Sequence, residues 1–371
     1  MSSFNSPNIA LALSGGGIRA MVFHLGVLRL LAERHLLEHV QRISTVSGGS
    51  LLVGLMLQEC EGRWPSSNDF LQTVYPALRE KLCQRSLQWG AARQLIRPWN
   101  VRFLLSRANL LALALEKEWN IRTKLRELPN TPEWSLNGTT AENGKRFRFK
   151  REDIGDYQIG YAAPNNFMLA SAMAVSAAFP GGFGPLRITT SEFSWRKKEW
   201  GAPIGTETPT AIEYPVLHLY DGGIYDNLGL EPFFDAGKGE PKHPGIVIIL
   251  SDAGSPLPSG FSSFALSPFR LQRVVDIMSD QAHALRVRTF SNYLQQSPGR
   301  GALIFMNTPV SDELPCKSAE FASRFPTTLR RVDLSEFDRL ADHGYRVATQ
   351  VERQYGLVSS PTDAFIRRRD R

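Results

Sequence analysis

The sequence predicts an α/β fold: a three-layer sandwich in which helices cover both faces of a mainly parallel central sheet, with a helical cap inserted into it. Within the first sixty residues, two short apolar runs alternate with two helical patterns, which is typical of a βαβ beginning. A third run, residues 245–250, has the continuous hydrophobic character of a strand buried on both faces. The alternation stops near residue 60 and resumes near residue 160, so we expect the cap between these points.

The elements follow in order along the chain. Residues 9–13 predict the first strand, and apolar residues then recur at helical spacing from 18 to 37. Residues 43–46 predict a second strand, and residues 51–57 a second helix. Beyond the cap, the same patterns predict helices over 166–178 and 264–289 and strands over 216–220, 245–250 and 302–306.

The domain prediction is one hydrolase-sized domain spanning residues 1–371, with residues 60–160 as the cap or insertion. This insertion is rich in tryptophan, proline and arginine, unlike the segments around it. The basic tail, residues 365–371, is expected to be disordered.

The composition describes a core-forming chain with a basic surface. Forty-three basic residues face 36 acidic ones, a formal net charge of +7, which favours anionic partners such as nucleic acid, lipid headgroups or an acidic ligand. Cys60, Cys83 and Cys316 lie far apart, which favours a reducing compartment and provides no zinc site. With no signal-peptide pattern and no apolar stretch long enough for a bilayer, we expect a cytoplasmic protein whose membrane contact is peripheral, at the inner face. No cofactor or metal is expected.

Ser47 is the first candidate for chemistry. It lies between a predicted strand and a predicted helix, where a tight turn presents its hydroxyl at the helix N-terminus, and Gly48 and Gly49 remove side chains that would clash there. The helix end also offers unpaired amides to a developing oxyanion. Thr45 stands where the GxSxG pattern has its first glycine. The rival serines, Ser44 and Ser50, fall within the strand and the helix.

A glycine run, Gly15, Gly16 and Gly17, follows the first strand. Such a loop is either a tight turn, an oxyanion hole or a phosphate cradle. The spacing from Gly15 to Ala20 also fits a dinucleotide-binding pattern, but the second strand ends without the acid that would bind a ribose. No Gly-Lys-Ser/Thr follows, which excludes a P-loop.

Asp221 closes a third strand and is followed by Gly222 and Gly223. An acid at the carboxyl end of a strand points into the crevice where α/β proteins bind ligands. Asp252 is the competing acid by the same logic. None of the seven histidines has a clear catalytic context, so a Ser–Asp dyad, in which the carboxylate accepts the serine proton, is the alternative to a triad.

Together these segments resemble the patatin-like phospholipase family, including its relatives among cytosolic phospholipases A2. The resemblance rests on four motifs in the family's order, which cover roughly residues 7–60 and 160–255. They are the segments 14–28 (the triple glycine and the start of its helix), 44–50 (around Ser47), 174–180 (Ala-Val-Ser-Ala-Ala-Phe-Pro) and 221–227 (Asp-Gly-Gly and its continuation).

The resemblance implies a lipid acyl hydrolase with Ser47 as nucleophile and Asp221 as base, working without histidine. It implies an oxyanion hole at Gly15, Gly16, Gly17, Ile18 and Arg19, in which the amides of Gly16 and Gly17 are the main donors. The supporting loops are Gly48, Gly49, Gly222 and Gly223. Ester hydrolysis would pass through an acyl-enzyme, and the substrate would be a membrane phospholipid or another acyl lipid.

Three further partner hypotheses accompany this one. Residues 93–119 combine arginines with Trp99 and leucines, which fits either a membrane-contacting surface or a cap helix packed on the core. Some bacterial members of the family are membrane-degrading effectors that cyclic oligonucleotides activate, so such an anion is a candidate activator. A non-catalytic protein that grips a phosphate or nucleotide with its glycine loop is the alternative class. A basic-aromatic run at 145–151 resembles an exposed strand more than a nucleic-acid motif, so no specific nucleic acid is expected.

Overall fold

The computed structural model describes residues 7–103, 106–179, 184–199, 201–203, 205–257, 259–261, 264, 268–310 and 317–357. The predicted disordered tail, residues 365–371, lies outside the described residues, as do Cys316 and Pro180.

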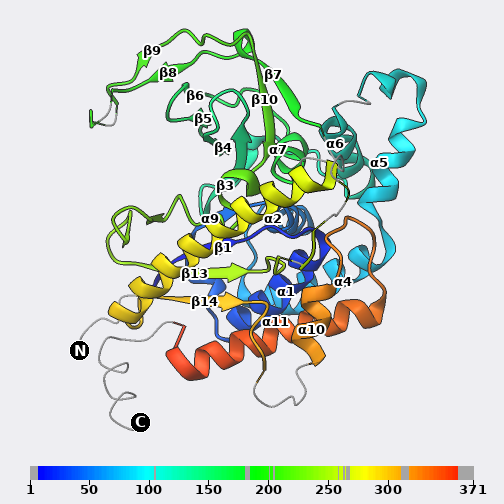
Figure 1. The fold of residues 1–371 in the computed structure, drawn as a ribbon, viewed down its shortest axis with the longest axis vertical. Coiled ribbons are helices and arrows are strands. Elements are labelled where there is room, and N and C mark those ends of the chain that lie inside the picture. The colour runs from blue at the N-terminus through cyan, green and yellow to red at the C-terminus, as the bar shows by residue number, and fades with distance from the viewer. Residues whose placement is uncertain are drawn as a thin grey trace.

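The centre of the molecule is a parallel sheet with the strand order β14–β13–β1–β2–β3 (Figure 1). Its strands are β1 (Asn8–Leu13), β2 (Val40–Thr45), β3 (Glu133–Thr140), β13 (Ile246–Asp252) and β14 (Gly301–Phe305). β1 is almost entirely apolar because it pairs with β13 on one side and β2 on the other, and helices cover both of its faces.

The two faces of β1 belong to two separate hydrophobic clusters. Ile9, Leu11 and Leu13 pack with helices α1 (Gly17–Glu33), α2 (Gly48–Glu59) and α11 (Leu334–Tyr355). Ala10 and Ala12 instead face Phe234 and Phe290, the latter from α9 (Pro268–Gln296), which runs across the front of the sheet in Figure 1. This arrangement of helix, sheet and helix confirms the predicted three-layer α/β fold.

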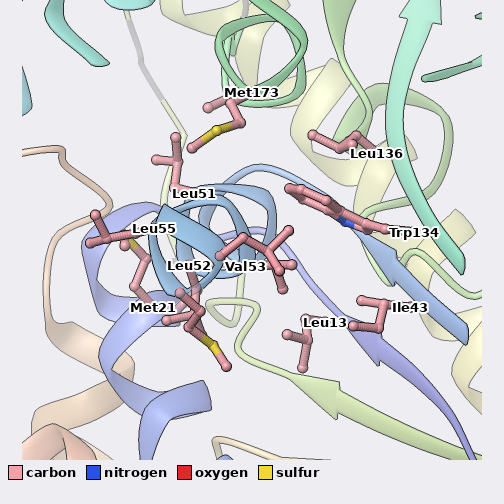
Figure 2. Close-up of a cluster of buried hydrophobic side chains, with 14 of the residues drawn as sticks. Leu13, Met21, Ile43, Leu51, Leu52, Val53, Leu55, Trp134, Leu136 and Met173 are labelled. Carbon is pink, nitrogen blue, oxygen red and sulfur yellow. The ribbon is translucent and has the colours of Figure 1, made fainter. Parts of the chain in front are cut away.

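Helix α2 lies in the middle of the larger cluster. Figure 2 shows Leu51, Leu52, Val53 and Leu55 radiating from it toward all sides, and every residue of the helix from Gly48 to Leu57 is buried. A helix that is apolar all round requires such an environment. Five other elements surround it, β1, α1, β2, β3 and α7 (Leu169–Ser176), through Leu13, Met21, Ile43, Trp134, Leu136 and Met173.

Beyond β3 the sheet becomes antiparallel. β3 pairs with β4 (Arg146–Phe149) along one edge and, past the end of β2, with β10 (Val216–Asp221) along the other. The remaining strands of this part are β5 (Ile154–Asp156), β6 (Gly160–Ala162), β7 (Leu186–Thr189), β8 (Arg196–Lys197) and β9 (Thr208–Pro209). A separate hairpin joins β11 (Phe234–Asp235) and β12 (Glu240–Pro241).

The predicted insertion, residues 60–160, is helical only in its first part. Its helices are α3 (Ser67–Asp69), η2 (Phe70–Val74), α4 (Tyr75–Gln84), α5 (Leu87–Leu95), η3 (Pro98–Phe103), α6 (Arg107–Glu118) and η4 (Leu125–Glu127). The expectation of a cap was wrong for β3, which is a strand of the central sheet. Its buried residues include Ser135, Asn137, Thr139 and Thr140, and these polar side chains concealed it from a hydrophobic pattern.

The basic-aromatic run at 145–151 is also placed differently from the prediction. Phe147 and Phe149 of β4 are buried, with ring centroids 4.9 Å apart. Arg148 forms an ion pair with Asp153 at 2.7 Å, and Lys150 pairs with Glu133. The run is therefore part of the core and its rim, since β4 lies between β3 and β5.

The C-terminal part adds helices that the sequence motifs did not place. Helix α11 begins at a capping box formed by Asp333 and Glu336 and packs along α1. The two helices cross where Gly26 of α1 lies against the backbone of α11 and Gly344 of α11 lies against the backbone of α1. The remaining short elements are η1 (Leu37–His39), η5 (Thr190–Glu192), α8 (Gly223–Asp226) and α10 (Lys317–Arg324). Among the described residues, no helix is both long enough and apolar enough to span a bilayer.

Candidate active site

Ser47 occupies a sharp turn between β2 and α2. Its backbone angles, φ 48° and ψ −115°, are rare for a residue with a side chain, as expected of a strained strand-to-helix elbow. Ser47 is the N-cap residue of α2, yet its side chain makes no capping hydrogen bond. The hydroxyl is therefore available to another partner. Gly48 is required beside it, because a Cβ there would lie 2.3 Å from the Gly17 carbonyl oxygen.

The end of β10 brings Asp221 to this turn. β2 pairs with β3 as far as Leu136, and β10 enters along the same edge of β3 from the opposite direction and ends at Gly138. The carboxyl ends of β2 and β10 therefore meet head to head, two residues apart along β3. The prediction that Asp221 ends a strand is correct, but its approach is antiparallel to β3.

Three side chains of neighbouring elements hold this junction together. The Asn137 amide of β3 donates to the Thr45 carbonyl at 2.9 Å, where β2 ends, and the Thr139 hydroxyl donates to the Asp221 carbonyl at 2.8 Å. The Ser176 hydroxyl of α7 accepts from the Ser47 amide at 3.1 Å. Sequence patterns indicate none of the three, because the polar residues of β3 resemble an exposed segment and Ser176 lies in a motif without an assigned role.

The segment after α7 also connects the two candidate residues through the backbone. The Ser176 carbonyl accepts from the Ser47 amide at 3.0 Å, and the Ala178 carbonyl accepts from the Asp221 amide at 3.3 Å. Ser176 and Ala178 belong to the Ala-Val-Ser-Ala-Ala-Phe-Pro motif, which thus contacts both Ser47 and Asp221 through these two residues.

Asp221 is buried in an environment that favours its neutral form. Burial raises the pKa of its carboxyl to about 7, while hydrogen bonds from the Gly223 amide and the Ser47 hydroxyl lower the pKa in part. The Gly223 amide donates at 2.7 Å. A carboxylate with a pKa near neutrality, in contact with a serine hydroxyl, has the basicity required of a general base.

The glycine loop presents fewer free amides than predicted. The Gly15 amide donates to the Asn227 carbonyl at 3.0 Å, and the Ile18 amide to the Thr328 carbonyl at 2.9 Å. The sequence placed both residues in the oxyanion-hole loop, but their amides already have acceptors and are not candidate donors. Among the described residues, the amides of Gly16 and Gly17 have no acceptor, so these two remain the candidate donors.

Arg19 serves the loop as a buried anchor. Its guanidinium donates to the carbonyls of Phe325 at 2.8 Å and Ala253 at 3.2 Å. Burial lowers its pKa to about 10, against the raising effect of the Asp252 charge. Arg19 thus ties the glycine loop to the C-terminal segments. Its guanidinium is bound by two carbonyl groups and is not a free cation in the cavity.

Of the other predicted glycines, Gly49 and Gly222 lie against neighbouring backbone and Gly223 lies against a side chain. Cβ atoms would lie 2.5 Å from the Leu13 oxygen at Gly49, 2.4 Å from the Asn137 oxygen at Gly222, and 2.9 Å from the Asn227 side-chain oxygen at Gly223. Each loop can therefore approach its neighbour only without a side chain.

Thr45 has a structural reason to replace the expected glycine. Its hydroxyl lies 2.7 Å from the Ser50 hydroxyl and accepts from the Trp134 indole at 2.9 Å. Ser50 in turn contacts the Ser176 hydroxyl at 2.8 Å. Thr45 is part of a buried network that fixes the start of α2, and the rival serine Ser50 is occupied within it. Ser44, the other rival, accepts from the Asn137 amide at 2.9 Å.

The competing acid, Asp252, and the histidines have other partners. Asp252 is fully buried and forms an ion pair with His283 of α9 at 2.9 Å. Burial lowers the pKa of His283, but the hydrogen bond and the charge of Asp252 together raise it above its usual range. His24 is buried in the core between Ser251 and the Ser14 carbonyl, in agreement with a structural role.

Ser47 and Asp221 line one cavity of about 530 Å³. Gly16, Arg19 and Asn227 belong to its wall, and α9 closes one side with a set of polar side chains: Asp276, Ser279, Asp280, His283 and Arg286. Sequence patterns predicted the helix but assigned it no role in the site. Within the described residues, no group of three or more His, Cys, Asp or Glu side chains could hold a metal ion.

The predicted membrane-contact segment, residues 93–119, spans parts of three elements. Helix α6 turns its leucines into the core, as a packed cap helix does, and Glu118 pairs with Arg93. Ile96 and Trp99, between α5 and α6, are strongly exposed. As far as its side chains are described, the segment is therefore mostly core packing, with Ile96 and Trp99 as its exposed apolar side chains.

Comparison with solved structures places the fold beside human GIVD cytosolic phospholipase A2. That structure matches with a TM-score of 0.56 and 15% sequence identity, over 94% of this chain and 59% of the human one. The same human enzyme in complex with methyl gamma-linolenyl fluorophosphonate matches with a TM-score of 0.52, 14% identity, and 94% and 57% coverage. The chain thus spans less than two thirds of the length of these neighbours. No curated protein sequence gives a significant match.

The sequence profile of the patatin-like phospholipase family matches residues 11–234. This range includes the glycine loop, the Ser47 elbow and the strand that ends at Asp221. Since the match covers more than half of the chain, the protein belongs to the patatin-like phospholipase family.

Proposed function

We propose that this protein hydrolyses acyl esters of lipids, with Ser47 as the nucleophile and Asp221 as the base. The observation that carries the proposal is the contact between the Ser47 hydroxyl, on its strained turn, and a buried carboxyl whose pKa is raised to about 7. Membership of the patatin-like phospholipase family supports an acyl lipid as the substrate.

In the proposed first step, Asp221 takes the proton of Ser47 while Oγ attacks the ester carbonyl. The resulting oxyanion accepts hydrogen bonds from the amides of Gly16 and Gly17, each typically worth about 3 kcal/mol of barrier. When the tetrahedral intermediate collapses, the C–O bond to the alcohol breaks, and the leaving oxygen takes the proton from Asp221. An acyl-enzyme on Ser47 remains.

In the proposed second step, Asp221 takes a proton from water, and the water oxygen attacks the acyl carbonyl. The intermediate collapses with release of the fatty acid, and Ser47 recovers its proton from Asp221. One carboxyl thus serves as base and acid in turn, which requires a pKa near the working pH. This explains how the site would work without a histidine.

The compartment proposed for this reaction is the cytoplasm, at a lipid surface. Among the described residues, Cys60 and Cys83 are free thiols, which is typical of a reducing environment.

The test combines covalent labelling with hydrolysis of a soluble short-chain ester. A fluorophosphonate probe is expected to label the wild-type protein and not Ser47→Ala. Asp221→Asn is expected to lower ester hydrolysis by at least about a thousandfold, in line with loss of a general base. Ser255→Ala, which changes an exposed serine of the same cavity, is the matched control and is expected to keep both properties.

Labelling and hydrolysis that persist in Ser47→Ala would contradict the proposal. A wild-type protein that reacts with neither probe nor ester would favour the alternative, a non-catalytic protein that binds a phosphate at the amides of Gly16 and Gly17.

A further inference from the structure

Helix α9 exposes apolar side chains to solvent along one stripe. Leu271, Val274, Val275, Met278 and Leu285 are exposed by between 48% and 72%. Their spacing, i, i+3, i+4, i+7 and i+14, places them on one side of the helix. Two exposed aromatic side chains, Phe261 and Phe264, precede the helix. We call these seven residues the α9 stripe.

The opposite side of the same half-helix is polar and turned toward the protein. Asp276, Asp280 and His283 line the cavity that contains Ser47, and His283 is paired with Asp252. This is the reverse of a surface helix, which buries its apolar side and exposes its polar side. A contiguous exposed apolar surface of this kind marks an interaction site.

The second half of α9 holds the helix in place. Phe290 is buried against Phe234, with ring centroids 5.3 Å apart, and Val287, Tyr293 and Leu294 pack against the same cluster. The first half therefore extends from a fixed anchor, and its polar side chains line the cavity. Figure 1 shows this long helix in front of the sheet. The packing of the second half of α9 on this cluster therefore fixes the direction in which the α9 stripe faces.

The mouth of the cavity continues the apolar surface. Phe179 and Ile224 are exposed cavity-lining side chains on the Asp221 side. An acyl chain that leaves a lipid layer in contact with the stripe would reach Ser47 across these residues.

The charges of α9 fit an anionic lipid surface. The helix carries four arginines, Arg270, Arg273, Arg286 and Arg288, against two acids, Asp276 and Asp280. Both acids line the cavity, as does Arg286, which pairs with Asp226, so the three other arginines give the rest of the helix a basic excess. The whole chain carries a net charge of +7. A helix with a basic excess and apolar side chains on its outer side binds the headgroup–acyl boundary of an anionic bilayer.

We propose that the α9 stripe docks the protein onto an anionic lipid bilayer and places the mouth of the cavity at the membrane surface. The lipid supplied there is the substrate of the proposed function, on which this inference rests. The docking element is thus α9, and not the segment 93–119, for which the sequence left open a membrane-contacting surface or a packed cap helix.

The test measures binding to vesicles of phosphatidylcholine with about one quarter phosphatidylglycerol. All chains carry Ser47→Ala, so that the lipid is not consumed. The double variant Leu271→Gln/Met278→Gln is expected to bind at least about tenfold more weakly, because two exposed apolar side chains are lost from the interface. Two control variants carry exposed apolar replacements elsewhere: Leu334→Gln on α11 and Ile96→Gln/Trp99→Gln. Both are expected to bind like the parent.

Hydrolysis of a soluble short-chain ester is measured separately in the Ser47 background. The α9 double variant is expected to keep this activity, which shows that it is folded. If no chain hydrolyses the ester, the proposed function fails, while the vesicle measurement still decides the docking proposal.

Two results would overturn the docking proposal. One is vesicle binding by the α9 double variant that equals the parent, including the case in which only Ile96→Gln/Trp99→Gln loses binding. The other is a parent protein that is dimeric in solution and becomes monomeric in the α9 double variant, which would assign the stripe to contact between two copies of this chain.

Discussion

Ser47 combines a strained backbone with a hydroxyl that has no capping role. A serine at a helix N-terminus ordinarily caps the helix, because its oxygen can accept one of the free amides there. Here the positive φ turns the side chain away from the helix end and toward Asp221. The same residue type would be structural in a relaxed turn, so the backbone conformation is what makes Ser47 a candidate nucleophile.

The raised pKa of Asp221 predicts the pH dependence of the reaction. The base must be ionised, so kcat/KM for a soluble ester is expected to rise with pH and to level off above about 7. The measurement is a pH–rate profile between about pH 5 and pH 9. A profile that is flat over this range would show that no group with the pKa of Asp221 limits the rate.

The raised pKa of Asp221 also predicts how the free energy of unfolding depends on pH. The carboxyl loses its proton near pH 3.8 in the unfolded chain and near 7 in the folded one, so the folded state binds more protons between these values. Stability from this group is therefore lost as pH rises through that window. Asp221→Asn is expected to raise the free energy of unfolding at alkaline pH, on the order of 1.4 kcal/mol for each pH unit that separates the two pKa values. Urea denaturation at several pH values measures this, and the two proteins are expected to differ least below the unfolded pKa.

At the scale of elements, the site depends on how β2, β10 and α7 meet. β2 and β10 share one edge of β3 from opposite directions, and the end of α7 accepts hydrogen bonds from both. Buried polar side chains of β3 satisfy the carbonyls that the interrupted pairing leaves free, which would otherwise be costly to bury. The junction is thus a pairing gap in the sheet, filled by the residues that hold the candidate dyad.

Adding a single methyl group where α1 and α11 cross is expected to destabilise the protein. A Cβ at Gly344 would lie 2.1 Å from the Phe23 carbonyl oxygen, so Gly344→Ala must separate the two helices. We expect it to lower the free energy of unfolding by at least about 3 kcal/mol, as measured by urea denaturation. Because α1 begins at the glycine loop, ester hydrolysis is expected to fall as well.

Gly90→Ala is the matched control for this crossing. It also lies within a helix, but its new methyl group would meet the flexible side chain of Glu118. Alanine is the better helix former, by about 1 kcal/mol, so this variant is expected to be neutral or more stable. Equal stabilities of the two variants would mean that the helices can move apart without cost.

At the scale of the whole molecule, residues 11–234, which match the family profile, lack part of the central sheet and one of its covering helices. β13 pairs with β1 along its full length, and α11 packs on α1, although both lie beyond residue 234, where the family match ends. Arg19 anchors the glycine loop to carbonyls of Phe325 and Ala253, also from the C-terminal part. The C-terminal third is therefore needed for both the core and the site.

A chain ended after residue 242 is accordingly expected not to fold. β1 would become an apolar edge strand and α1 would lose its covering helix, which exposes a surface prone to aggregation. The measurement is soluble expression and cooperative thermal unfolding, with the full chain as the control. A soluble fragment with one unfolding transition and ester hydrolysis would show that residues 11–234 form an independent domain.

Local patterns in the chain are enough to predict four of the five parallel strands of the central sheet, several of the helices and the residue types of the site. Continuous apolar runs mark strands buried on both faces, and glycine pairs mark close backbone approaches, because both signals involve only neighbouring residues. For this reason the parallel sheet, Ser47, Asp221 and the glycine loop were all found from patterns and resemblance. β3 was missed, because its buried polar residues imitate an exposed segment.

The folded arrangement alone reveals which of these groups are free to act. Gly15 and Ile18 differ from Gly16 and Gly17 because carbonyls of Asn227 and Thr328, distant in the chain, accept their amide protons. The antiparallel entry of β10 and the outward apolar side of α9 are likewise set by contacts between remote segments. A local pattern specifies what a residue can do, but its partners and its burial depend on packing between parts of the chain that the pattern does not relate.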